Sequence, residues 1–433
     1  MADPTPPPSL PSVRSEVGRL RHVVVQPPGV ALDRMLPRHI QHGSADYLLF
    51  DDLVHVPQAQ AEHADLRMVL GAVAQVHLLE DMVTTVLDTD TGRDGVLGRV
   101  AALYDLPGDS LRRLRELDAD ALTQTLIVGT LGGTLDAPEL FQPLPNLIFT
   151  RDLAAVTGDL VIVGNARMPA RQRESVLTWA VVDHHPLFSG ATVSPTSRRI
   201  SQLRHSAPLT VEGGDVLVIS EQVACIGASE RTTWSMIVHL ADELIESGFT
   251  SVLVVEMPKQ RSSMHLDTVF TLADRDVCVV YPPLLTPGDP EESQVLRITR
   301  ESSGKGTVVE ALTGDLVACL ADEGHPLQAV RCGGGHPVHA RREQWTDGAN
   351  YVALGPGVVV GYARNTHTAR EMSRAGFRVV DPHGFMAEFQ RDFQGDPDQL
   401  FGSGRRYAIH LQGSELSRGR GGPRCLTMPV VRD

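Results

Sequence analysis

Short apolar runs recur along the whole chain, and each follows a polar or glycine-containing turn. Their β-branched residues and their length of a few residues are typical of strands. Amphipathic segments lie between some of them; residues 234–245 place Trp234, Ile237 and Leu244 on one face of a helix that ends at Gly248. This alternation predicts a mixed α/β fold built from repeated units. The predicted strands lie within 21–29, 158–167, 213–227, 251–258, 275–283, 357–365 and 406–416, and further helices within 58–71 and 366–376.

One segment departs from this alternation. Residues 83–141 are rich in Leu, Arg, Asp and Ala at helical spacing and contain few strand-like runs. We expect a small helical subdomain inserted into a catalytic α/β body formed by residues 14–82 and 142–433; the alternative is further helix within one domain. The Pro-rich residues 1–13 read as a disordered tail.

Composition excludes several classes of protein. The chain has 433 residues and a formal net charge of −14, without a basic stripe interleaved with aromatic residues, which argues against a nucleic-acid partner. No apolar run approaches the roughly 18–20 residues of a membrane helix, and the start does not resemble a secretory signal. Five cysteines without a CxxC pair argue against a disulfide framework and a structural zinc site. A cytoplasmic protein is expected.

Three short stretches combine ionisable groups with glycines or apolar runs. In "MHLDTVF", a strand would place His265 and Asp267 on the same side. "VEGGD" offers Glu212 and Asp215 around two glycines, and "FTRD" offers Asp152. Each stretch also has a purely structural interpretation: a buried histidine paired with its own aspartate, a turn before a strand, or an ion pair at a strand end.

A fourth stretch, "SRGRGGPRCLTMP", holds Cys425 among glycines and three arginines, Arg418, Arg420 and Arg424. Nearby positive charge stabilises a thiolate, which is the nucleophilic form of cysteine; an exposed, unreactive cysteine is the alternative. Taken together, the four stretches supply a nucleophile, a proton shuttle, a glutamate to orient it, and surplus carboxylates. Because two carboxylates match a guanidinium, the set indicates a planar, cationic substrate.

The order of motifs resembles bacterial arginine deiminase, within the guanidine-modifying (pentein) superfamily. The resemblance extends from "SEVGRLRHVVVQPPG" through "LLFDD", "PNLIFTRD", "EGGD", "IGASERT", "MHLDTVF", "REQWTDGAN" and "GVVVGYARNT" to "ELSRGRGGPRCLTMP". It implies a five-bladed α/β propeller of ββαβ units around a polar channel, with a helical insertion after the first unit. "QPPG", with Gln26 and Pro27, stands where family members often have "HRPG".

The resemblance also implies roles for individual residues. Cys425 would be the nucleophile, His265 the general acid/base and Glu212 its partner, while Asp152 and Asp267 would grip the guanidinium nitrogens. Asn146 and Phe149 match pocket positions, and the residues matching those that hold the α-carboxylate of arginine are Arg171, Arg231 and Arg420.

The activity implied is hydrolysis of L-arginine to L-citrulline and ammonia through a covalent thiouronium intermediate, without metal or organic cofactor. A homo-oligomer, dimer or tetramer, is expected from the same resemblance. The alternatives are an amidinotransferase, a deiminase of another guanidino compound, and a non-catalytic relative that only binds arginine.

Overall fold

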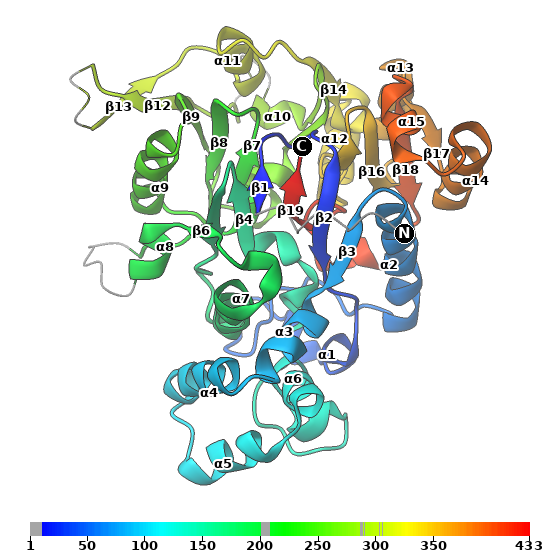
Figure 1. The fold of residues 1–433 in the computed structure, drawn as a ribbon. Coiled ribbons are helices and arrows are strands. Elements are labelled where there is room, and N and C mark those ends of the chain that lie inside the picture. The colour runs from blue at the N-terminus through cyan, green and yellow to red at the C-terminus, as the bar shows by residue number, and fades with distance from the viewer. Residues whose placement is uncertain (1–10, 201–207, 286–288, 290, 303, 305) are drawn as a thin grey trace, which may run out of the picture.

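The computed structural model describes residues 11–200, 208–285, 289, 291–302, 304 and 306–433, and it has a mixed α/β architecture (Figure 1). The predicted α/β class is therefore confirmed. Most of the predicted disordered tail, residues 1–10, lies outside the described residues, but Ser12–Val13 form a strand, β1, that pairs in parallel with the C-terminal strand β19 (Met428–Arg432).

The strands form five separate sheets, and one pairing pattern recurs in all of them. An antiparallel pair is extended by a strand that runs parallel to its second member: β4–β5 by β6, β7–β8 by β9, β10–β11 by β14, β15–β16 by β18, and β19–β2 by β3. The strands, sheet by sheet, are β1, β19, β2 (Leu20–Val25) and β3 (Gln75–Leu78); β4 (Ala154–Thr157), β5 (Leu160–Val163) and β6 (Thr192–Val193); β7 (Val216–Val218), β8 (Val223–Ala228), β9 (Ser251–Glu256), β12 (Val295–Arg300) and β13 (Thr307–Ala311); β10 (Phe270–Asp274), β11 (Val277–Val280) and β14 (Gln328–Arg331); and β15 (Val352–Gly355), β16 (Val358–Tyr362), β17 (Arg378–Val380) and β18 (Tyr407–Leu411).

Helices supply the crossovers that parallel strands require. In the first three units α2, α7 and α9 connect the paired strands, and Figure 1 shows helices on the periphery of the sheets. In the part of the chain that the structure describes, no helix is both long and apolar enough to traverse a bilayer. The α-helices are α1 (Val30–Asp33), α2 (Val56–Gly71), α3 (Leu79–Leu87), α4 (Asp90–Tyr104), α5 (Gly108–Glu116), α6 (Ala119–Val128), α7 (Gln172–His184), α8 (Pro195–Arg199), α9 (Trp234–Glu246), α10 (Pro282–Leu285), α11 (Leu316–Asp322), α12 (Pro337–Trp345), α13 (Thr366–Arg374), α14 (Pro382–Phe393) and α15 (Pro397–Gly402).

The apolar runs read as strands are strands, and almost all of their side chains are buried. The strand predictions for β2, β5, β7, β8, β9, β11, β16 and β18 are confirmed, as are the helices α2, α9 and α13. Sequence reasoning missed the hairpin β12–β13, because Val308 and Val309 are exposed on its outer strand and do not belong to a core pattern.

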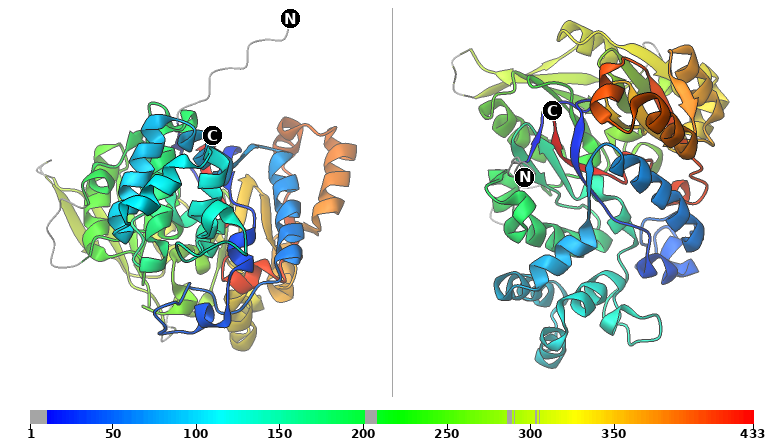
Figure 2. Two further views of the ribbon diagram at one scale, coloured as in Figure 1. Left: turned by 90° about the horizontal axis from the view of Figure 1, so that it is seen from below. Right: turned by 45° about the vertical axis from the view of Figure 1, so that its right-hand side comes forward.

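Residues 83–141 are mainly helical, as expected. Helices α3 to α6 group at one end of the molecule (Figures 1 and 2). Their apolar residues, including Val83, Leu97 and Leu122, join the same buried cluster as Leu177 and Val181 of α7. The helices therefore share a hydrophobic core with the second unit, and the boundaries of an inserted subdomain stay a prediction.

The first and last described strands, β1 and β19, pair in the first sheet. The C-terminal strand β19 lies between β1 and β2, and β1 bridges to the β4–β5 turn through Val13 and Gly158. Because Cys425 lies three residues before β19, this closure carries it to the middle of the molecule, next to the turns of the other units.

Candidate active site

Each unit places a polar turn directly before its first strand, and these turns carry several residues of the candidate site. The turns precede β4, β7, β10, β15 and β19. Because each turn has the same place in its unit, side chains from distant sequence positions come together. The residues concerned are Asp152 before β4, Glu212 and Asp215 before β7, His265 and Asp267 before β10, Asn350 before β15, and Arg424 and Cys425 before β19.

His265 does not lie in a strand, as the predicted pairing with Asp267 required. It is in extended conformation immediately before a short 3-10 helix, Leu266–Thr268, which turns Asp267 to a separate position. The expectation of two side chains on one face of a strand is therefore wrong, although both residues reach the site. Asp215 causes the turn, because its two carboxylate oxygens accept hydrogen bonds from the Leu266 N–H at 2.9 Å and from Ser229 Oγ at 2.6 Å.

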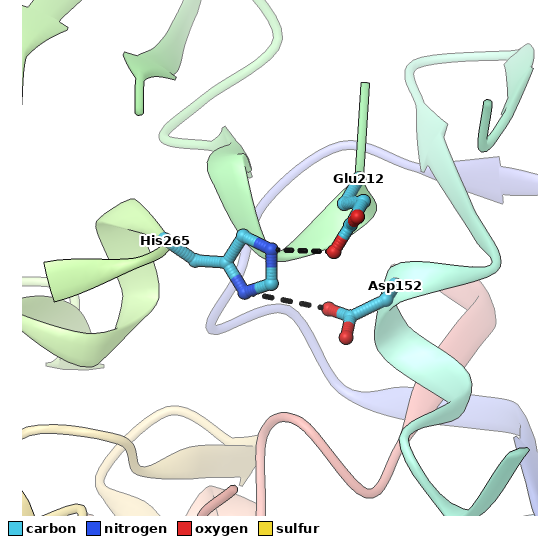
Figure 3. A group of neighbouring side chains, drawn as sticks. All are labelled: Asp152, Glu212 and His265. Carbon is cyan, nitrogen blue, oxygen red and sulfur yellow. Dashed lines mark hydrogen bonds and ion pairs between the residues drawn. The ribbon is translucent and has the colours of Figure 1, made fainter. Parts of the chain in front are cut away.

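Glu212 and Asp152 hold the two ring nitrogens of His265 (Figure 3). Nε2 is 2.9 Å from Glu212 Oε2, and Nδ1 is 3.6 Å from Asp152 Oδ1. Burial alone would lower the pKa of the imidazole, but Asp152, the bond to Glu212 and Asp215 outweigh it and raise the pKa of His265 to about 9. The ring is therefore positively charged at neutral pH and can donate a proton.

Cys425 is buried rather than exposed, with 4% of its surface accessible. The Asn350 side-chain oxygen accepts hydrogen bonds from the backbone N–H groups of Arg424 and Cys425, at 3.0 and 3.1 Å. The thiol sulfur lies 3.7 Å from Asp267 Oδ2. Cys425 is thus fixed by contacts to two other units.

The arginines of the cysteine loop do not leave Cys425 with a lowered pKa. Arg424 favours the thiolate, but burial and the neighbouring carboxylates outweigh it. Arg418 pairs with Asp52 and Glu415, and Arg424 pairs with Glu16 and Asp267. Burial, followed by the charges of Asp267 and Asp152, raises the pKa of the Cys425 thiol well above its usual value. In the ligand-free site the thiol is neutral.

Three carboxylates in this site each leave one buried oxygen without a hydrogen-bond partner in the described structure: Asp152 Oδ1, Asp267 Oδ1 and Glu212 Oε1. Their other oxygens are occupied by Arg171, Arg424 and His265, respectively. A buried acceptor without a donor costs free energy unless a ligand satisfies it. The arrangement therefore suits a ligand with several N–H donors and a positive charge.

The three arginines predicted to hold an α-carboxylate have different surroundings. Arg171 is enclosed by Asp152 at 2.6 Å, Glu174 at 2.7 Å and Glu212 at 3.3 Å. Arg231 approaches Glu212 only at 3.6 Å. Arg420 has no carboxylate closer than Asp51, at 3.8 Å. Within the described residues, Arg231 therefore has only long ion pairs, to Glu212 and to Glu230 at 3.7 Å, and Arg420 has only the one to Asp51.

These side chains surround one pocket. All the predicted site residues except Asp267 line it, and Asp267 lies behind the sulfur of Cys425. Asn146 is fixed by its amide, which donates to the Leu48 carbonyl at 2.8 Å. Leu49, Arg261 and Met264 complete the wall, and sequence reasoning had not selected them.

Two glycines of the recognised motifs are explained by close approach. A Cβ on Gly214 would lie 2.8 Å from the ring of His265 and 3.0 Å from Asp152 Oδ1. A Cβ on Gly422 would lie 2.6 Å from the Asn350 oxygen that holds Cys425. Side chains at these positions would displace groups of the site.

Asp152, Glu212 and His265 also bring ligand atoms within 4.8 Å of one another, a spacing that could hold a metal ion. However, the Arg171 guanidinium already donates to both carboxylates, and His265 carries a proton at neutral pH. A metal would have to displace one cation and deprotonate another, so these residues fit a guanidinium better than a metal ion.

Sequence reasoning missed two supporting residues. Asn350 lies in "REQWTDGAN", a motif that was recognised without being given a role. Glu16 accepts two hydrogen bonds of 3.0 Å from Arg424, which in turn donates to Asp267. No local pattern marks either residue, because the partners of the Asn350 side chain lie more than 70 positions away and Arg424 lies 408 positions from Glu16.

Comparisons with known proteins agree with this geometry. A sequence profile of the family described as arginine deiminase matches residues 132–432. Proteins named arginine deiminase align over nearly their full length: one from Latilactobacillus sakei is 31% identical (97% of this chain, 98% of that one). One from Rhodococcus erythropolis is 34% identical (97% of both), and one from Mycobacterium tuberculosis 34% (97% and 98%).

Solved structures share the fold at low sequence identity. An amidinotransferase from Microseira wollei superimposes with a TM-score of 0.52 at 12% identity over 97% of both chains. A mutant of AgrE in complex with L-arginine gives a TM-score of 0.51 at 14% identity, over 96% of this chain and 40% of that one. With the sequence relatives, these likenesses make the protein a hydrolase of the pentein superfamily. Within that superfamily, the chain belongs to the arginine deiminase family.

Proposed function

We propose that the protein hydrolyses L-arginine to L-citrulline and ammonia, with Cys425 as the covalent nucleophile. The observation that supports this most strongly is a pair of buried carboxylate oxygens without a hydrogen bond among the described residues, Asp152 Oδ1 and Asp267 Oδ1. They lie beside a buried thiol and a protonated imidazole, and Asp152 Oδ1 is 3.6 Å from Nδ1 of that imidazole. A guanidinium supplies N–H donors and one positive charge to such a pair.

Substrate binding prepares the nucleophile in this mechanism. The two aspartates orient the guanidinium so that its central carbon faces the sulfur of Cys425. Its positive charge offsets the carboxylates that keep the thiol neutral, so the thiol loses its proton to solvent once the substrate is bound. The thiolate then attacks the carbon, and a C–S bond forms.

His265 handles the protons of both halves of the reaction. The imidazolium donates to the departing nitrogen, the C–N bond breaks, and ammonia leaves a thiouronium adduct. The neutral ring then takes a proton from water, which attacks the adduct, and the C–S bond breaks to release citrulline. Glu212, 2.9 Å from Nε2, orients the ring throughout.

Arg231 and Arg420 are proposed to bind the α-carboxylate, since neither has a close carboxylate of its own. The enclosed Arg171 would contribute from a distance or after rearrangement. We further propose that the five ββαβ units are the blades of a propeller around this pocket, with residues 83–141 as the insertion, and that the protein is a cytoplasmic homo-oligomer.

Incubation of purified protein with arginine alone tests the function. We expect stoichiometric citrulline and ammonia, with little product from agmatine, canavanine or methylarginines in parallel reactions. An amidinotransferase would need glycine or lysine as acceptor before arginine was consumed. Product from agmatine at the rate seen with arginine would contradict the role of the arginines.

The protonation of His265 predicts the alkaline limb of the pH profile. Because the acid form is needed and the pKa of His265 is about 9, kcat/KM should fall as pH rises through that value. Glu212→Gln removes the charge and weakens the bond that favour the imidazolium, so the limb should move to lower pH. A limb that stays in place in Glu212→Gln would show that another group controls it.

A further inference from the structure

Arg420 is a buried cation without a close carboxylate. The same is true, among the described residues, of Arg151, Arg173 and Arg432, but of these four only Arg420 lines the pocket. Arg171 and Arg424, which are also buried, each bind two or more carboxylates at 2.6–3.3 Å. Arg420 is only 5% exposed, yet Asp51 at 3.8 Å is its nearest carboxylate, and its Nε has no hydrogen-bond partner. A buried charge needs a compensating partner. The charge of Arg420 is therefore available to an anionic ligand.

Trp345 supplies much of the compensation that is present. The guanidinium carbon of Arg420 lies 3.6 Å from the centroid of the indole, and Nη1 donates to the Trp345 carbonyl oxygen. An indole is the strongest aromatic partner for a cation. Arg420 itself has left-handed backbone geometry, with φ of 65°. This geometry sets the direction of its side chain, and the indole of Trp345 holds the guanidinium there.

The neighbours of Trp345 hold its indole in place. Glu343 accepts hydrogen bonds from the His367 and Thr368 N–H groups, both at 2.8 Å, which anchors α12 to α13. The Gln344 amide donates to the Ser262 carbonyl, beside the site. Trp345 is 42% exposed, so its position depends on these buried neighbours, and its indole face depends on Arg420 for cover.

Competing partners for Arg420 lie close by. Asp347, two residues after the indole, is buried and has one carboxylate oxygen, Oδ2, without a hydrogen-bond partner. Asp51 is already bound by Arg261 at 3.2 Å. Without the indole, Arg420 would be free to move towards these carboxylates. Its positive charge would then no longer be available to bind a ligand.

We propose that Trp345 is the positioning residue for Arg420, and that it sets the selectivity of the pocket for substrates with a carboxylate at the far end. This inference rests on the proposed function. It assigns Trp345 a role in recognising the amino-acid end of arginine, while the guanidinium end and the chemistry are left unchanged.

The test compares Trp345→Leu, which removes the aromatic face, with Trp345→Phe, which keeps a smaller one. Loss of the cation–π contact to the buried Arg420 should raise the KM for arginine roughly tenfold in Trp345→Leu, with kcat nearly unchanged. Trp345→Phe should recover part of the loss. The inhibition constant of agmatine, which lacks the carboxylate, should stay at the wild-type value in both variants.

Controls separate this role from general damage. Trp234→Leu changes another exposed tryptophan, on α9, and should leave KM unchanged. Combining Trp345→Leu with Arg420→Ala should cost no more than Arg420→Ala alone, because both remove one interaction. An unchanged KM in Trp345→Leu, an equal rise in the agmatine constant, or additive losses would each overturn the proposal.

Fluorescence gives a second measurement that does not require Trp345 to be replaced. The chain has three tryptophans, so Trp179→Phe with Trp234→Phe leaves Trp345 as the only reporter. Arginine should change its emission in a Cys425→Ala background, and agmatine should not. If wild-type protein releases no citrulline from arginine, the proposed function fails first; if it does and the emission does not respond, only the role of Trp345 fails.

Discussion

Cys425→Ala should abolish the release of citrulline and ammonia from arginine, to the limit of detection. The sulfur is the only thiol among the described residues that line the pocket, and none of these residues has a hydroxyl side chain. Without the thiol, the proposed covalent adduct cannot form. The fold should survive, because the contacts that fix this position come from the backbone N–H of residue 425 and from Asn350. Alanine keeps that N–H.

The measurement combines product assay with substrate binding. Calorimetry should show that Cys425→Ala still binds arginine, since the aspartates and arginines of the pocket remain. Cys278→Ala is the matched control: Cys278 is fully buried in β11, outside the pocket, and its loss should lower stability slightly without reducing kcat. Citrulline production by Cys425→Ala at a measurable rate would refute the covalent route.

The elements of the fold were predictable where local pattern decides them. A run such as residues 357–365 has β-branched residues and turn signals that suffice to define β16. The 3-10 turn at Leu266–Thr268 was not predictable from "MHLDTVF", because Asp215, some fifty positions earlier, accepts the N–H that fixes it. Tertiary contacts override local propensity at such positions.

Most residues that line the candidate pocket were named from the sequence, but their charge states could not be predicted from it. The arginines beside Cys425 predicted a stabilised thiolate, and the structure instead pairs Arg424 with Glu16 and Asp267. The pKa of the thiol follows from burial and from carboxylates that belong to other units. The local sequence shows which charged residues are near Cys425 along the chain. It does not show which of them are already paired with an opposite charge from another part of the fold.

Asp267→Asn should lower the turnover of arginine while raising the reactivity of the Cys425 thiol, two properties that usually change together. Loss of one charge from the guanidinium site should lower kcat/KM for arginine roughly a hundred- to thousandfold, as loss of a preorganised electrostatic contact does elsewhere. The same substitution removes, after burial, the largest influence that raises the pKa of the Cys425 thiol. The thiol should therefore become more reactive towards iodoacetamide at neutral pH while turnover falls.

The structure indicates that this variant will fold, because Arg424 keeps both of its hydrogen bonds to Glu16. Asp274→Asn is the matched control: Asp274 lies in β10 of the same unit, pairs with Arg406 outside the pocket, and should change neither rate. If Asp267→Asn lost turnover and thiol reactivity together, Asp267 would be supporting the thiolate rather than opposing it. That result would contradict the proposal that the thiol is neutral before substrate binds. It would also contradict the proposal that the charge of the substrate causes the thiol to lose its proton.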